Sequence, residues 1–235
     1  MTKQFVSNRD ESVRMFRSDL LEKFTHVHPV VPHLIYWPVV GYMLFLSIQG
    51  GIGFGLTGLL FLAGPLLWSL TEYLMHRWVF HVADEVMEET TAIVSSLKPG
   101  EAVLPALKGW QHKRYFIAHG VHHDFPSDSE RLVMAPAVSV SLAVLFYYVF
   151  KLMLGAAYVP AIYAGFVVGY LVYDTTHYAV HHFRMSSKLG QYLKQHHFRH
   201  HFRDPDSNYG VSSPLWDVFF GTFQGRRAVD PSEQT

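Results

Sequence analysis

The chain has 235 residues, of which 49 % are apolar, 15 % are aromatic and only 16 % are charged. A soluble domain carries roughly 25 % charged residues, so this composition favours a membrane protein. The 19 basic and 19 acidic residues cancel, which excludes the basic surface of a nucleic-acid-binding protein. Cysteine is absent, so any bound metal must use nitrogen or oxygen ligands rather than thiolates.

The length predicts one domain, residues 1–235, made of five consecutive segments. Its first segment, residues 1–31, is polar and mixed and has no apolar core followed by a signal-peptide cleavage site. Within this segment apolar residues recur at helical spacing from Phe16 to Phe24. That pattern suits a helix lying in the membrane interface, and it suits a plain surface helix equally well.

Two long apolar stretches predict four transmembrane helices in an all-α fold. The first, residues 32–75, is interrupted by a glycine-rich turn near residues 49–53, and the second, residues 132–173, turns near Gly155. Roughly 20 apolar residues cross a bilayer, so each stretch is long enough for a hairpin of two helices. Because each hairpin returns to its starting side, residues 76–131 and 174–235 are expected to form one helical cap in a single aqueous compartment.

The positive charges predict which compartment the cap faces. Of the 19 lysines and arginines, only Lys151 falls beside a hairpin turn. Cytoplasmic segments of membrane proteins carry an excess of these residues. We therefore expect a multi-pass membrane protein with its cap on the cytosolic face of a bacterial cytoplasmic membrane or of the endoplasmic reticulum.

Sixteen histidines are the excess that the composition has to explain, and ten of them form four clusters beside the predicted spans. Those ten are His76 and His81; His119, His122 and His123; His177 and His181; and His197, His200 and His201. Imidazole is the commonest side-chain metal ligand and suits iron, zinc and copper. Two metals, each held by about five histidines with a position open for oxygen, are the economical interpretation.

The spacing within the clusters predicts how their side chains point. The pattern HxxHH occurs at residues 119–123 and 197–201, and its two adjacent histidines point about 100° apart on an ideal helix. One such motif can therefore serve two neighbouring metals. His76 and His81, five residues apart, point about 140° apart on an ideal helix, so we expect them to bracket one metal rather than share it.

Side chains beside the clusters are expected to support the ligands. A metal-bound imidazole usually donates its other N–H to a carboxylate or a carbonyl. Glu72, four residues before His76, and Asp174, three before His177, are placed for that role, with snorkelling to the interface as the alternative. Three further histidines are expected to be hydrogen-bonding or surface residues, namely His112, His182 and His196.

In these motifs the chain resembles the fatty acid hydroxylase superfamily of integral-membrane di-iron enzymes, and within it the fatty acid 2-hydroxylases. The similarity runs through HRWVFH (76–81), HGVHHDFPSDSERLVMAP (119–136), YDTTHYAVHH (173–182), LKQHHFRHH (193–201) and NYGVSSPLWDVFFGTF (208–223). Histidine spacing alone also admits sterol and carotenoid oxidases. The YDTTHY motif and Arg131-Leu132-Val133 favour the 2-hydroxylase branch.

The resemblance implies an O2-dependent monooxygenase that hydroxylates C2 of a fatty acyl chain, with two electrons, in a membrane lipid such as a ceramide or in a free fatty acid. It assigns the ten histidines above as ligands of two iron ions, which zinc could replace in purified protein. Tyr173 and Asp174 match family residues near the substrate. Because no cytochrome b5 domain occurs in these 235 residues, we expect a separate electron donor, cytochrome b5-like or ferredoxin-like.

Two other functions are compatible with parts of the pattern. A sterol or carotenoid hydroxylase or desaturase of the same superfamily would share the histidine spacing. A metal transporter would also need histidines, but transporter sites lie near the bilayer midplane on broken helices, whereas these histidines lie beyond the ends of the spans. The sequence predicts no oligomeric state.

Overall fold

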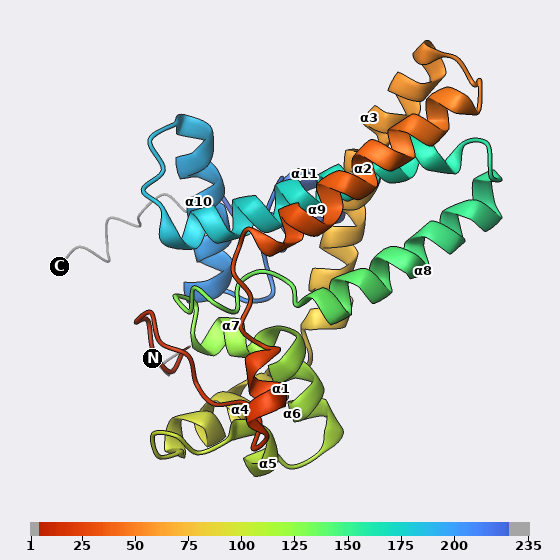
Figure 1. The fold of residues 1–235 in the computed structure, drawn as a ribbon. Coiled ribbons are helices and arrows are strands. Elements are labelled where there is room, and N and C mark those ends of the chain that lie inside the picture. The colour runs from red at the N-terminus through yellow and green to blue at the C-terminus, as the bar shows by residue number, and fades with distance from the viewer. Residues whose placement is uncertain (1–4, 226–235) are drawn as a thin grey trace.

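The computed structural model describes residues 5–225, and in that range the chain is helical and contains no β-strand (Figure 1). Its elements are α1 (Asp19–Lys23), α2 (Val31–Gln49), α3 (Phe54–Met75), the π-helix η1 (His76–Phe80), α4 (Asp84–Ser96), α5 (Val103–Ala106), α6 (Trp110–Tyr115), the π-helix η2 (Phe116–Gly120), α7 (Val121–Asp124), α8 (Pro136–Leu154), α9 (Val159–His182), α10 (Lys188–Phe202) and α11 (Leu215–Phe220). The turns of both hairpins, α2–α3 and α8–α9, lie on the same side of the molecule, while α4 to α7 and α10 gather at the opposite end.

Within residues 5–225, three helices are long and apolar enough to cross a membrane: α2, α3 with its extension to Phe80, and α8. The helices of the first hairpin coincide with the predicted ones. In the second hairpin α8 begins only at Pro136, since proline suits the first turn of a helix, where its missing N–H is not needed. Helix α9 continues past Tyr173 to His182. Its second half is polar, so α9 as a whole is less apolar than the three helices named above.

Helix α9 forms the centre of the hairpin bundle, because both α2 and α3 pack on it. The ring of Tyr170 meets the rings of Tyr36 and Trp68 edge-on, each with a centroid distance of 5.2 Å. Helices α3 and α9 approach closely at Gly64 and Gly165, where no side chain separates them. A Cβ atom at Gly64 would lie 2.3 Å from the Phe166 nitrogen, so this contact requires glycine.

Gly64→Ala is expected to destabilise the protein by at least about 1–3 kcal/mol, because the added methyl group overpacks the α3–α9 contact. The matched control is Gly58→Ala on the same helix, where a Cβ atom meets nothing within 4 Å. Thermal unfolding of both purified variants tests the difference. Equal midpoints for the two variants would contradict this account of the packing.

The N-terminal segment folds against the cap. Its backbone bonds to the cap at both ends of the segment: the Val6 N–H donates to the Asp124 carbonyl (2.9 Å), and the Leu104 N–H donates to the Met15 carbonyl (3.1 Å). Helix α1 has only five residues, shorter than the predicted one, because the Glu22 carboxylate accepts the N–H groups of Met15 and Phe16 and holds them outside the helix. The cap therefore has its own apolar core, which includes Met15.

Candidate metal centre

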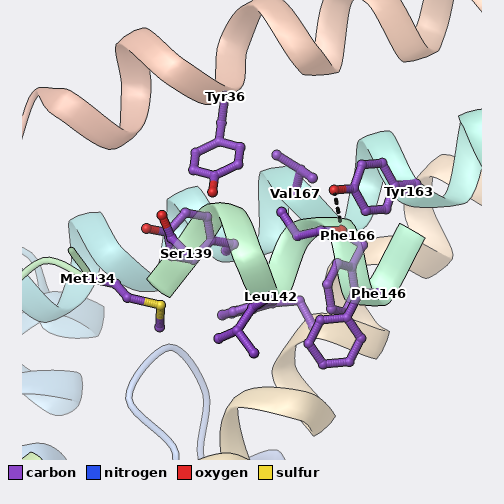
Figure 2. Close-up of a pocket in the computed structure, with 11 residues that line it drawn as sticks. Tyr36, Met134, Ser139, Leu142, Phe146, Tyr163, Phe166 and Val167 are labelled. Atoms are coloured by element: carbon purple, nitrogen blue, oxygen red, sulfur yellow. Dashed lines mark hydrogen bonds between the residues drawn. The ribbon is translucent and has the colours of Figure 1, made fainter. Parts of the chain in front are cut away.

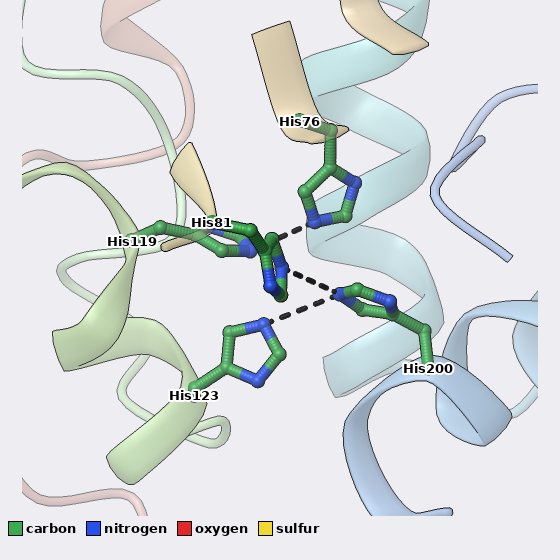
Figure 3. A group of neighbouring side chains, drawn as sticks. All are labelled: His76, His81, His119, His123 and His200. Atoms are coloured by element: carbon green, nitrogen blue, oxygen red, sulfur yellow. Dashed lines mark hydrogen bonds between the residues drawn. The ribbon is translucent and has the colours of Figure 1, made fainter. Parts of the chain in front are cut away.

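The first histidine group consists of five buried side chains from four segments of the chain. They are His76, His81, His119, His123 and His200. One ring nitrogen of each lies within 4.8 Å of the others, and Figure 3 shows the five rings converging on one point. The π-helix η1, which continues α3, begins at His76 and leads into His81, while η2, α7 and α10 carry the other three.

The second histidine group has the same form and lies beside the first. It consists of His122, His177, His181, His197 and His201. Helix α9 supplies two of its members, α10 supplies two and α7 supplies one. Each HxxHH motif contributes to both groups, since His122 and His123 point to different groups, as do His200 and His201.

The separations between ring nitrogens suit a metal at the centre of each group. Facing Nε2 atoms lie 2.9 Å apart in the pair His76 and His119, and 2.9 Å apart in the pair His122 and His177. Two nitrogens bound to one ion at about 2.1 Å and at right angles would lie about 3.0 Å apart. A neutral imidazole carries only one N–H, so five converging nitrogens cannot all be satisfied by one another. Both groups are therefore compatible with metal binding.

One feature of the predicted geometry is wrong: His76 and His81 belong to the same group. The prediction assumed an α-helix, but residues His76–Phe80 form a π-helix, in which the His81 N–H donates to the His76 carbonyl at 3.2 Å. A π-helical turn closes at i+5, so residues five apart return to the same face. The widened turn thus brings both imidazoles to one point.

Backbone carbonyls orient two histidines of the first group. His76 Nδ1 donates to the carbonyl of Tyr209 at 2.5 Å, and His200 Nδ1 donates to the carbonyl of Ser207 at 2.8 Å. Since each neutral ring has one N–H, these bonds leave Nε2 of both rings as a lone pair that points into the group. Such a fixed tautomer is the one that a metal ligand needs.

Glu72 does not bond to His76, contrary to the role predicted for it. Its carboxylate accepts the N–H groups of Val211 (2.6 Å) and Ser212 (2.9 Å) and the Ser212 hydroxyl. The side chain leaves α3 toward the loop between α10 and α11, so it holds the loop that carries Tyr209. Glu72 therefore supports His76 through this loop instead of directly.

Asp217 anchors the other side of the same loop, and the sequence analysis assigned it no role. Its fully buried carboxylate accepts the N–H groups of Tyr209 (2.8 Å) and Gly210 (2.9 Å), and it contacts His196 Nε2 at 3.0 Å. The sequence does contain a signal for this role, because Asp217 is the only charged residue between positions 209 and 223. An acid in so apolar a segment needs buried partners.

The remaining predicted residues lie outside both groups. Asp174 accepts a hydrogen bond from the Tyr170 hydroxyl at 3.1 Å and contacts no histidine of either group, while the Tyr173 ring stacks on His177 at 5.7 Å. The three histidines that were expected to have supporting or surface roles also lie outside the groups, namely His112, His182 and His196. Of these, His196 is fully buried.

Burial favours the neutral form of the histidines in the two groups. It lowers the pKa of His119, His123 and His201 well below the ordinary value of 6.5, and repulsion from neighbouring imidazoles lowers each further. A neutral imidazole is the form that binds metal, so protons do not compete for these nitrogens near neutral pH.

The metal-free protein is expected to lose stability as the pH falls from about 7.5 to about 5.5. Histidines of the unfolded chain take up protons near their ordinary pKa of about 6.5, whereas the folded protein holds its buried histidines neutral. The unfolded state therefore binds more protons, and acid lowers the free energy of unfolding. Thermal midpoints of chelator-treated protein across this pH range measure the effect, and a midpoint that is constant or rises with acid would contradict it.

Apolar helices of membrane-spanning length, joined to a cap that holds two groups of five histidines, define a helical membrane-type protein with a paired metal-binding site. Comparison with known families agrees with this class. The family model described as fatty acid hydroxylase matches residues 107–222, and this chain belongs to the fatty acid hydroxylase family.

Similar proteins occur in plants, fungi and animals. The dihydroceramide fatty acyl 2-hydroxylase FAH2 of Arabidopsis thaliana is 34 % identical over 219 residues, covering 93 % of this chain and 83 % of the relative. The fatty acid 2-hydroxylase of Rattus norvegicus is 34 % identical and is covered over 59 % of its length, with 94 % of this chain. A solved structure of scs7p, in which only the hydroxylase domain is visible, is 30 % identical with a TM-score of 0.73, covering 88 % of this chain and 70 % of that one.

Proposed function

We propose that this protein is a membrane monooxygenase that hydroxylates C2 of a fatty acyl chain, in a ceramide or other sphingolipid or in a free fatty acid, using O2 and two electrons. The observation that carries the proposal is the pair of five-histidine groups at the base of the apolar hairpins, in a chain of the fatty acid hydroxylase family. Relatives that match most of the chain are named as acyl 2-hydroxylases.

We propose that the ten histidines bind two iron ions, one in each group. When bound, the irons would activate O2 for insertion into the C–H bond. The chain itself supplies neutral nitrogen ligands, and the carbonyls of Tyr209 and Ser207 fix the tautomers of two of them. Imidazole accepts zinc as well, so zinc can occupy the same site in purified protein.

The substrate path that we propose begins at an apolar slot between α8 and α9 (Figure 2). Leu142, Phe146 and Phe166 form its apolar wall, while the Tyr170 hydroxyl at its polar end donates to Asp174. The slot has room for little more than a water molecule, about 20 Å³, so an acyl chain requires the exposed helix α8 to move outward. Tyr173 and Asp174 are the proposed substrate-contacting residues, since along α9 they come between Tyr170, which lines the slot, and His177.

We propose that the protein crosses the membrane four times and that its cap faces the cytosol, as one hydroxylase domain. The turns of both hairpins lie on one side of the molecule, away from α7 and α10, which carry five of the ten histidines. Helix α9 is less apolar than the other three long helices because its C-terminal end is polar. Its first half is buried against α2 and α3, so these helices would shield it from lipid. A separate electron donor, cytochrome b5-like or ferredoxin-like, would dock on the cytosolic face.

The absence of native cysteine makes this topology directly testable. With the protein expressed in a bacterial cytoplasmic membrane, Ala156→Cys in the turn of the second hairpin is expected to react with a membrane-impermeant maleimide in intact cells. Ser96→Cys, at the exposed end of α4 in the cap, is expected to react only after permeabilisation. Labelling of both cysteines from the same side would contradict the four-span arrangement.

The function is tested by expressing the protein, with a suitable electron donor, in a host that lacks 2-hydroxylated lipids. Lipid mass spectrometry is expected to detect 2-hydroxyacyl lipids with the intact protein and none with His197→Ala. Unchanged lipids with the intact protein would refute the proposal. An oxidised sterol or carotenoid as the product would favour the related activities of the superfamily, while metal accumulation without lipid oxidation would favour a transporter.

A further inference from the structure

A cavity of about 500 Å³ lies in the cap between α4 and the loop of residues 203–206 that follows α10. We call it the carboxylate cavity. Its charged side chains are Asp84, Glu88, Asp204, Asp206 and Arg203. Two histidines, His123 and His201, also line it, and each belongs to a different histidine group. An acidic lining thus leads to both groups at once.

His123 and His201 lie side by side where the two groups meet. Their rings stack with a centroid distance of 4.4 Å and an angle of 24° between planes. His123 Nε2 lies 3.2 Å from His200 Nε2 in the first group, and His201 Nε2 lies 3.0 Å from His197 Nε2 in the second. An ion that reaches the inner end of the cavity therefore lies beside one histidine of each group.

Two buried polar atoms, one in the lining of the cavity and one beside it, have no hydrogen-bond partner. One is Nδ1 of His201, which is only 3 % exposed, and the other is Oδ2 of Asp124, next to His123 in the chain. The second oxygen of Asp124 accepts from Thr91, which lines the cavity. A buried polar atom without a partner costs about 1–3 kcal/mol. The unpaired Nδ1 of His201, unlike that of His122, His177 or His197, belongs to a side chain that lines the cavity.

The carboxylates also crowd one another across the cavity. Partial burial raises the pKa of Asp206, and the charges of Asp84 on α4 and Asp204 in the loop raise it further, whereas the hydrogen bond from Tyr209 and the charge of Arg77 oppose the rise. Like charges held this closely attract a cation, which relieves their repulsion. The chemistry of the lining thus fits a divalent cation rather than an anion or an apolar molecule.

We propose that the carboxylate cavity is the port through which divalent transition-metal ions enter from the aqueous side and reach both histidine groups. This inference rests on the proposed metal centre. The carboxylates raise the local concentration of cations, and the imidazoles then take the ion, because nitrogen ligands suit transition metals better than carboxylate oxygens do. The apolar slot beside α8 is lined by none of the ten histidines and by no charged residue, so it offers a hydrated cation no partner.

The port is tested by the rate of metal uptake into chelator-treated full-length protein in detergent, with Fe²⁺ under anaerobic conditions and Co²⁺ as the probes. Asp84→Asn with Glu88→Gln removes two carboxylates of the cavity. Glu85→Gln with Glu89→Gln removes two charges from the same helix without touching the cavity lining, and it is the matched control. We expect the cavity variant to take up metal about tenfold more slowly at low salt, with a smaller difference at high salt, and to reach the same final content.

A second pair of variants adds charge instead of removing it. Ser95→Lys places a cation in the lining of the cavity, whereas Ser96→Lys places it one residue further along α4, outside the lining. We expect only Ser95→Lys to slow uptake. Because both positions are exposed, neither substitution disturbs the folded core.

Equal rates of metal uptake in the cavity variants and in their controls would refute the proposal that the cavity is the port. A reduced final metal content in the double carboxylate variant would also overturn it, since the carboxylates would then be ligands rather than an entrance. Failure of every form, including the unsubstituted protein, to bind metal would refute the metal centre itself and the port with it.

Discussion

His181→Ala is expected to abolish 2-hydroxylated product and to lower the metal content from two ions per chain to about one. His181 Nε2 lies 2.9 Å from His197 Nε2 in the second histidine group, so its loss opens that group while the first stays complete. Loss of a hydrogen-bonding partner of a metal ligand already costs about 10–100-fold in affinity or activity, so loss of the ligand should cost at least about 100-fold.

The neighbouring histidine provides the matched control. His182 is adjacent to His181 on α9, but it lies outside both groups, where its ring stacks on Tyr178 at 4.6 Å. His182→Ala is therefore expected to retain both metals and full product formation. Metal analysis of the purified variants, together with lipid mass spectrometry, separates the two residues. An equal loss of metal in both variants would refute the assignment of the second group.

Asp217→Ala is expected to lower the free energy of unfolding by about 3–5 kcal/mol, because it leaves His196 and two backbone N–H groups buried without their acceptor. The same substitution releases the loop whose carbonyls orient His76 and His200. Metal affinity is therefore expected to fall by about 10–100-fold, although Asp217 lies in neither histidine group.

Asp19→Ala on the exposed helix α1 is the control for the loss of a carboxylate, since the Asp19 side chain is 84 % exposed. It is expected to change neither stability nor metal affinity by a measurable amount. Asp217→Asn keeps the shape and one acceptor oxygen, so it should lie between Asp217→Ala and the unsubstituted protein. Unaltered metal affinity in Asp217→Ala would show that the loop does not orient the ligands.

The ten histidines that converge in two groups share a local signal in the sequence. Spacing of three and four residues defines which side chains share a helical face, and the two HxxHH motifs therefore indicated that one motif serves two groups. His76 and His81 were the exception. Their arrangement depends on a π-helix, which ideal α-helical spacing does not reveal.

The supporting residues were harder to predict, since their partners are far away in the chain. Glu72 and the loop residues Val211 and Ser212 are about 140 positions apart, and no periodicity links them. Helical spacing suggested His76 as the partner of Glu72, but the carboxylate satisfies N–H groups of the loop that would otherwise be buried without acceptors.

By itself, the sequence determined the helical class, the apolar hairpins and the set of histidines, because composition and short-range periodicity dictate which residues seek the lipid and which share a helical face. Only the tertiary structure decided how the ten histidines divide into two groups, which carbonyls fix their tautomers and where an acidic cavity meets them. These features arise where helices from distant parts of the chain pack together, and such contacts leave no repeating pattern in the sequence.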